Sequence, residues 1–293
     1  MKALKYVFVL GFVSLVLISC ADKKAAPRLI FKYKFDSTQV RLDNFGNPAT
    51  MPANHRGQSP KFHKMSAHYI ELAPNQLTAL GAGVVLYKAA ETATPAIIFD
   101  QDTKAADGEE FFSMAISDVT PGTYSWLRVS LAYQNYDINY RVGPPAIPVT
   151  YDGVGTIAAF IGFKTYITSY VINTQSIAVN ADKLQGYWGF ETTIPGFGVY
   201  TTQGQAPPGA TTVPNPLFAT SPIPSGSCVV TAAFTSPLTI TGNETNDIVV
   251  EVSLSINKSF EWIESGGNNL YEPMSGDTVI DMGVRGMIPT VVQ

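Results

Sequence analysis

Histidines provide the pattern in this chain that comes nearest to a chemical site. The chain has three, and His55, His63 and His68 all fall within 14 residues, with Met51 and Met65 beside them. Imidazole and thioether are both acceptable copper ligands, so the group is a candidate metal site. In an extended segment, however, His63 and His68 would point to opposite faces, because an odd number of positions separates them. We therefore favour separate loop and strand histidines, and keep metal binding as the alternative.

Carboxylate pairs and nucleophile motifs suggest no enzyme. Glu109-Glu110 follows Gly108 and reads as a solvated turn, and Asp100-Gln101-Asp102 lacks the glycine and final glutamate of a calcium loop. Asp277 and Asp281 are a further pair of carboxylates. Glycosidase chemistry would require two carboxylates that face each other, and the spacing of these residues does not indicate that. The chain has no Gly-x-Ser-x-Gly, Walker or His-Glu-x-x-His motif. We expect no catalytic residue, and an envelope enzyme acting on carbohydrate or peptide ranks last among the hypotheses.

Aromatic residues gather between positions 124 and 190 and form the second candidate site. Exposed aromatic side chains bind sugars and other flat ligands, and they also form protein interfaces. The competing interpretation is a β-sandwich core with tyrosine hydroxyls at its rim. The candidate ligand-binding residues are Trp126, Tyr136, Tyr187 and Trp188.

The N-terminus has the pattern of an export signal. Lys2 and Lys5 precede the apolar run Tyr6 to Ile18, which is too short to span a membrane as a helix. Leu17-Ile18-Ser19-Cys20 resembles the lipobox of bacterial lipoproteins. That resemblance implies a signal peptide at 1–19, a lipidated Cys20, and a tether over 20–28. Several acyl chains make a stable membrane anchor, and Ala21 after the cysteine favours an outer-membrane lipoprotein of the cell envelope.

Charge and cysteine content exclude several classes of protein. The formal net charge is −4, and removal of the two lysines of the signal makes it more negative. The chain therefore lacks the excess of basic residues that is typical of nucleic-acid-binding proteins. Hydrophobic residues make up 45% of the chain, enough to build a core. With Cys20 lipidated, Cys228 has no partner for an intrachain disulfide, and we expect it to be buried as a small hydrophobic residue.

Period-two alternation predicts an all-β fold. Leu29 to Phe35 alternates apolar residues with lysine, and Ile248 to Ile256 reads as a half-buried antiparallel strand. No window sustains a helical stripe, and turn residues recur every 8 to 15 positions. We expect an antiparallel β-sandwich, Ig-like or jelly-roll-like, with very little helix. Further expected strands are His68–Leu72, Gly83–Lys88, Ala96–Phe99, Glu110–Ile116 and Tyr124–Tyr140.

Residues 195–227 are dense in proline, glycine and threonine and predict a long loop. We favour one β-sandwich domain, residues 29–293, with this loop as an insertion. The alternative is two β units at 29–194 and 228–293, of which the second is marginal for an independent core. The tail after residue 260 should dock on the domain with Trp262 buried, because a large apolar side chain is costly to leave in water.

The order of the segments resembles the MbnP-like lipoproteins over residues 29 to about 191. The resemblance rests on Phe31-Lys32-Tyr33-Lys34-Phe35, Ser66 to Leu72, Pro121 to Val129, and Gly186 to Glu191. It implies a periplasmic β-sandwich of a family associated with copper uptake and diheme peroxidase partners. Some copper-binding members have an oxidised tryptophan close to one of the histidines in sequence, and here no tryptophan lies near His55, His63 or His68.

These patterns together favour a non-enzymatic binding or interaction module, anchored to the membrane through its lipid, with no cofactor. Its partner would be an unidentified small ligand or an envelope protein, and not a nucleic acid. The alternative is an MbnP-like protein that handles copper or another metal and works with a redox partner, using His55, His63 or His68.

Overall fold

The computed structural model describes residues 26–43, 45–101, 103–206, 224 and 227–292, so the expected signal peptide and Cys20 lie outside the described residues. Within these ranges the chain forms strands and two short 3₁₀ helices, as the all-β prediction requires. No helix of the described part is long and apolar enough to cross a membrane. The elements are β1 (Arg28–Asp36), β2 (His55–Gln58), β3 (Lys61–Ala73), β4 (Val84–Lys88), β5 (Ile97–Ile98), η1 (Phe99–Gln101), β6 (Thr103–Ala105), β7 (Glu110–Ala115), η2 (Ile116–Asp118), β8 (Gly122–Val142), β9 (Tyr151–Phe160), β10 (Lys164–Val171), β11 (Ser176–Leu184), β12 (Tyr187–Ile194), β13 (Gly198–Gln205), β14 (Cys228–Ile240), β15 (Ile248–Ser255), β16 (Phe260–Ile263), β17 (Thr278–Asp281) and β18 (Met287–Val292).

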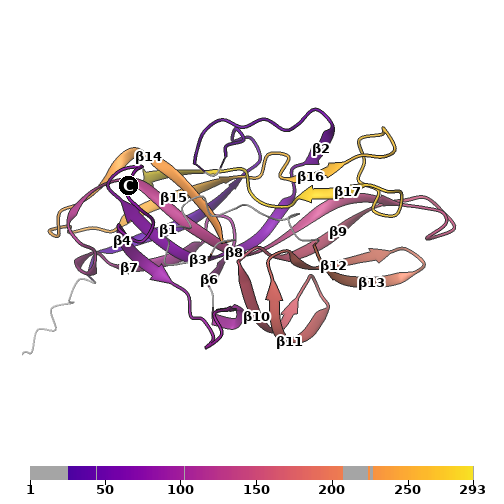
Figure 1. Cartoon of the computed structure of the whole chain (residues 1–293), viewed down its shortest axis with the longest axis horizontal. Coiled ribbons are helices and arrows are strands. Elements are labelled where there is room, and N and C mark those ends of the chain that lie inside the picture. The colour runs from indigo at the N-terminus through magenta and orange to yellow at the C-terminus, as the bar shows by residue number, and fades with distance from the viewer. Residues whose placement is uncertain (1–25, 44, 102, 207–223, 225–226, 293) are drawn as a thin grey trace, which may run out of the picture.

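A sandwich of two sheets forms one half of the molecule (Figure 1). Its first sheet has the order β18-β15-β1-β7, and its second is the part of the eight-stranded sheet in which β14, β8 and β3 lie side by side. Leu29, Phe31 and Tyr33 of β1 are fully buried and share one core with Val129 and Leu131 of β8. The alternation read from the sequence of β1 therefore does face the core as expected.

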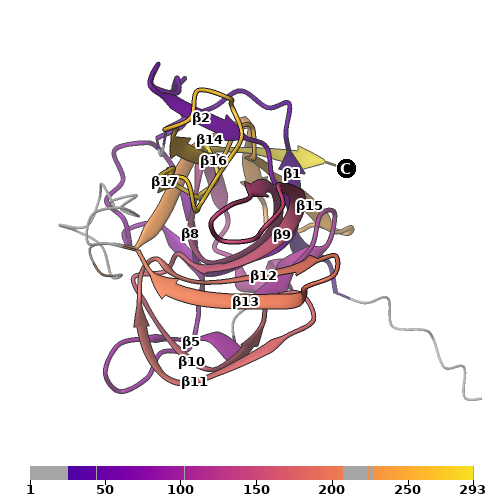
Figure 2. The same ribbon diagram turned by 90° about the vertical axis from the view of Figure 1, so that its right-hand side faces the viewer.

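Strand β8 extends the eight-stranded sheet beyond the sandwich. It is 21 residues long; β14 pairs with its first half, β9 with its second half, and β3 with its middle, from Trp126 to Asp137. Strands β12 and β13 continue from β9, and this part of the sheet curls (Figure 2). A second core beneath it, built on Phe160, Tyr170 and Tyr187, packs against the small sheet β11-β10-β5.

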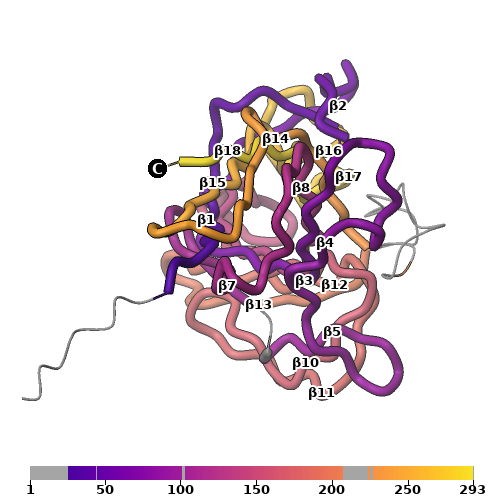
Figure 3. Tube along the Cα trace, turned by 90° about the vertical axis from the view of Figure 1, so that its left-hand side faces the viewer, coloured from indigo at the N-terminus to yellow at the C-terminus, as the bar shows by residue number. Residues whose placement is uncertain are grey.

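Strand β15 corrects one detail of the sequence prediction. It is antiparallel to β18 but parallel to β1, with Leu29 opposite Ile248 and Asp36 opposite Ser255. Figure 3 shows β1 and β15 side by side. Alternation reports only that one face is buried; it does not report strand direction. On the solvent face of the parallel pair, Lys34 Nζ lies 3.2 Å from Glu251 Oε1.

The predicted loop at 195–227 is wrong over its first part, because residues 198–205 form β13, the hairpin partner of β12. Phe197 N–H donates to Ile194 O at 2.9 Å, and Pro195 and Gly196 (φ +80°) occupy the two central positions of the turn. The sequence concealed this strand because β13 is exposed and has no apolar alternation. Residues 207–223, 225 and 226 lie outside the described residues.

The C-terminal tail docks on the domain as predicted. Trp262 in β16 is 2% exposed, and β18 pairs with β15 along the edge of the sandwich. Strand β14 likewise joins β8, so the segments on both sides of residues 206–227 share sheets. Cys228 is buried, and burial raises the pKa of its thiol to about 12.

Candidate functional site

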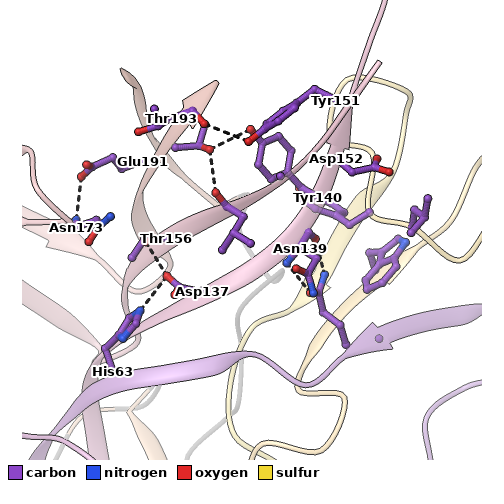
Figure 4. Close-up of a pocket in the computed structure, with 18 of the residues that line it drawn as sticks. His63, Asp137, Asn139, Tyr140, Tyr151, Asp152, Thr156, Asn173, Glu191 and Thr193 are labelled. Atoms are coloured by element: carbon purple, nitrogen blue, oxygen red, sulfur yellow. Dashed lines mark hydrogen bonds and ion pairs between the residues drawn. The ribbon is translucent and has the colours of Figure 1, made fainter. Parts of the chain in front are cut away.

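A polar cleft of about 790 Å³ lies where the second half of β8 meets β9, β12 and the segment between β16 and β17 (Figure 4). Its size is within the ordinary range for small-molecule sites. Strand β8 sends Asp137 and Asn139 into its wall, and β9 sends Thr156, whose register partner is Asp137. The other polar or aromatic lining residues are Gln58, His63, Tyr140, Tyr151, Asp152, Asn173, Glu191, Thr192, Thr193, Trp262, Asn269 and Tyr271.

His63 reaches the cleft through a β-bulge. In the pairing of β3 with β8, Phe62 lies opposite Tyr136 and Lys64 opposite Asn135, so His63 is the extra residue. Its Nε2 lies 2.8 Å from Asp137 Oδ1, and the Thr156 hydroxyl donates to the same oxygen at 2.7 Å. Figure 4 shows the three side chains in a row across the floor of the cleft.

Glu191 stabilises a turn at the edge of the cleft. The backbone N–H groups of Asn173, Thr174 and Gln175 donate to its carboxylate at 2.9–3.0 Å, and the Thr174 hydroxyl adds a fourth bond. Burial acts to raise the pKa of Glu191, but the Thr174 hydroxyl and the backbone amides outweigh it, so the pKa is lowered. This carboxylate therefore ties the turn between β10 and β11 to β12.

All carboxylates lining the cleft already have partners. Asp152 binds Arg141 in a bidentate pair, with Nε at 2.5 Å and Nη2 at 2.7 Å, and these bonds lower the pKa of Asp152. Asp137 has His63 and Thr156, and Glu191 has the β10–β11 turn. A charged ligand would have to displace one of these partners, whereas an uncharged ligand would not.

Several neutral polar groups in the cleft remain without partners. The indole Nε1 of Trp262 is buried and has no hydrogen bond within the described structure. The side-chain amides of Asn139 and Asn173 form none either, because their bonds to Gln58 and Glu191 use backbone atoms. Nε1 of Trp262 has almost no accessible surface, whereas the side chains of Asn139 and Asn173 are exposed, so these two amides are the groups that a ligand in the cleft can reach.

A second, apolar cavity of about 930 Å³ lies beside the cleft. Alternation along β8 separates the two, since Asp137 and Asn139 line the cleft while Ile138 and Val142 line the apolar cavity. Tyr140, Thr192 and Tyr271 line both. The main apolar side chains of the second cavity are Ile138, Val142, Ile147, Ile157, Trp188, Phe190, Phe197, Val199, Tyr200, Phe260, Met274 and Met282.

The structure places the three histidines beside three different carboxylates. His55 Nδ1 lies 2.5 Å from Glu261 Oε1, a carboxylate that also binds Arg41, and His68 Nε2 lies 3.0 Å from Glu91 Oε1. His63 lines the polar cleft, and His55 and His68 line neither the cleft nor the second cavity. Across the described residues, no group of three or more His, Cys, Asp or Glu is positioned to hold a metal ion. The geometry therefore does not favour a shared metal site at these histidines.

The four aromatic candidates have different surroundings. Tyr136 and Tyr187 are buried core residues, and Trp126 is half-buried but lines neither cavity. Trp188 lines the apolar cavity. Asp137, Asn139 and Trp262 were missed as site residues, although the alternation Asp137-Ile138-Asn139-Tyr140-Arg141-Val142 is a signal that one face of β8 meets polar surroundings.

Comparison of the chain with models of protein families, with curated proteins and with solved structures found no match.

Proposed function

We propose that the chain is a non-enzymatic binding lipoprotein of the bacterial cell envelope, and that its polar cleft takes an uncharged, hydroxyl-rich small molecule such as a short glycan. The observation that carries the proposal is the state of the polar groups of the cleft: its three carboxylates are bound by the protein, while the exposed side-chain amides of Asn139 and Asn173 line it without a hydrogen bond in the described structure. A side-chain amide both donates and accepts, so it is suited to a ligand hydroxyl.

The balance of charges supports a neutral ligand. Asp137, Asp152 and Glu191 are the carboxylates of the cleft, and each is already bound by residues of the protein. The free amides of Asn139 and Asn173 can both donate and accept, which suits hydroxyl groups. Tyr140, Tyr151 and Tyr271 add ring surface of the kind that packs against the apolar face of a sugar.

The proposal includes the membrane anchor and the cellular location. Cys20 would carry the lipid and hold the domain at the outer membrane, and the cleft would collect its ligand there. Such a protein needs no catalytic residue; the His63–Asp137 pair would then fix the floor of the cleft rather than move protons.

The test is calorimetric titration of the mature chain, residues 20–293 with Cys20→Ser so that no detergent is needed. The probes are the neutral pentasaccharides of cellulose, chitin and starch, with tetragalacturonate as the charged comparison. We expect one of the neutral glycans to bind, and Asn139→Ala to weaken it about tenfold, the loss expected for one hydrogen bond of roughly 1.4 kcal/mol.

Asn243→Ala is the matched control, because this exposed asparagine lines neither cavity and its replacement should leave the affinity unchanged. Asn173→Ala should weaken binding in the same direction as Asn139→Ala. Preference for the charged oligosaccharide, no binding of any neutral glycan, or equal affinity in Asn139→Ala would each overturn the proposal.

A further inference from the structure

The apolar cavity has a floor of aromatic rings that lie over glycine positions. A Cβ at Gly155 would lie 2.1 Å from a ring carbon of Phe190, and one at Gly204 would lie 2.7 Å from Trp188. Both contacts are too short for a side chain, so the rings lie against the bare backbone of β9 and β13. Such packing leaves the space above the rings open for a ligand.

The rim of the cavity exposes a group of large apolar side chains. Phe197 is 56% exposed, Val199 53%, Tyr200 54% and Met274 64%, and all four line the cavity. Large apolar side chains that gather at one opening, rather than lying scattered, indicate a surface that meets another apolar molecule.

The charges of the lining exclude an anionic headgroup. Among the residues that the structure describes, Asp277 and Asp281 are the charged ones that line this cavity, and no lysine, arginine or histidine does. Both acids have partners: Asp281 Oδ2 lies 3.0 Å from Arg285 Nη1, and Asp277 accepts the backbone N–H groups of Ser265 and Glu272 at 2.8 Å. A carboxylate or phosphate in the cavity would meet these two acids and no basic side chain of the described lining.

We infer that this cavity is a second ligand site, and that it takes an uncharged lipid-like molecule with a long hydrocarbon chain. The chain would lie on the rings of Trp188 and Phe190, and a neutral polar head would lie near Asp277, Gln205 and the rim. The volume of about 930 Å³ is at the upper end of ordinary ligand sites, as a long chain requires. This site is separate from the polar cleft and does not depend on what the cleft binds.

The experiment uses the uncharged fluorescent probe N-phenyl-1-naphthylamine with the same detergent-free mature chain. We expect saturable binding in the micromolar range. 1-Monopalmitoylglycerol should displace the probe at least tenfold more effectively than palmitate, which has the same hydrocarbon chain but a negative charge.

Two variants test whether the probe binds in this cavity. Thr202→Trp places a large ring in the cavity and should weaken probe binding at least tenfold, whereas Thr201→Trp, on the opposite face of β13 and in neither cavity, should not. Met274→Lys changes an exposed rim residue that can be replaced without disturbing the core, and it should bring the affinity for palmitate close to that for monopalmitoylglycerol.

The displacement experiment and the two variants test the inference separately. Absence of probe binding, equal displacement by palmitate and monopalmitoylglycerol in the unchanged protein, or probe binding that persists in Thr202→Trp would overturn the inference. If Thr202→Trp fails to fold, as its melting curve will show, Met274→Lys still decides, because an unchanged palmitate affinity would contradict the charge argument.

Discussion

Glu71 Oε1 lies 3.5 Å from Arg128 Nη1, and neither side chain is exposed to solvent. Glu71 also accepts the N–H groups of Gly81 at 3.0 Å and Gly83 at 2.7 Å, and Arg128 donates to the carbonyl oxygens of Gln76, Thr78 and Ala79. Burial lowers the pKa of Arg128, and the opposing charge of Glu71 acts to raise it. The pair therefore holds the loop between β3 and β4 against β8.

Glu71→Gln should lower the free energy of unfolding by about 3–5 kcal/mol, because it leaves the Arg128 charge buried without compensation. Urea unfolding followed by circular dichroism measures this. Glu251→Gln is the matched control: the Lys34–Glu251 pair is well exposed, so its loss should change stability by about 1 kcal/mol or less. Equal losses in the two variants would contradict the structural role given to Glu71.

His68 should make stability depend on pH. Burial lowers its pKa below 6.5, although the hydrogen bond and charge of Glu91 act to raise it. The unfolded chain therefore takes up a proton first. The contribution of His68 is fully present above pH 6.5 and is lost as the pH falls from 6.5 to the lowered pKa of the folded state, by about 1.4 kcal/mol per pH unit.

Urea unfolding at intervals between pH 7.5 and pH 5 would show this loss, which His68→Gln should reduce, since glutamine does not titrate. The difference between the two proteins isolates His68 from the other titrating groups. A parallel pH dependence in both would show that His68 takes up its proton equally in the folded and unfolded chain.

Gly155→Ala tests the packing beneath the apolar cavity. Its Cβ would lie 2.1 Å from the Phe190 ring, so the ring must move. We expect a loss of about 1–3 kcal/mol in the free energy of unfolding, typical of an overpacked core. Gly283→Ala is the control, because the contact nearest to its Cβ is an ordinary 3.6 Å to Asp281. If the two variants unfold at the same urea concentration, the ring does not rest on Gly155.

Cys20→Ala should abolish lipid labelling and leave an uncleaved precursor or a released protein. Metabolic labelling with an alkyne fatty acid and partition into Triton X-114 measure the two effects. Cys228→Ala should keep both the label and the partition, because that thiol is buried and its pKa is raised to about 12. Detergent partition of Cys20→Ala like that of the unchanged protein would refute the lipobox interpretation.

Much of the fold could be predicted from local pattern. The alternation of Leu29–Phe35 and Ile248–Ile256 identified β1 and β15 with their buried faces, and Trp262 was correctly expected to be buried. The parallel pairing of these strands could not be predicted, since direction depends on the path of the chain between them. β13 was missed because an exposed hairpin strand need not alternate.

The candidate site was harder to predict because it depends on register. His63 meets Asp137 only because a bulge in β3 inserts one residue there, and His68 is the extra residue of another bulge, between Ala67 and Tyr69. No spacing rule for a regular strand anticipates such displacements. The unpartnered N–H of Trp262 likewise depends on neighbours that come from distant segments.

The pairing of β1 with β15 also dictates when the molecule can fold. Arg28 at the start of β1 bonds to Asp247, 219 positions later in the chain. During synthesis from the N-terminus, Leu29, Phe31 and Tyr33 therefore remain without their parallel neighbour until almost the whole chain has been made. Contacts between residues so far apart in the sequence form slowly. Until β15 is available, β1 has an unpaired edge and an apolar face, and both promote aggregation. The nascent chain should thus require a chaperone that shields β1, and a chain truncated before residue 248 should be a target for proteolysis rather than a partly working protein.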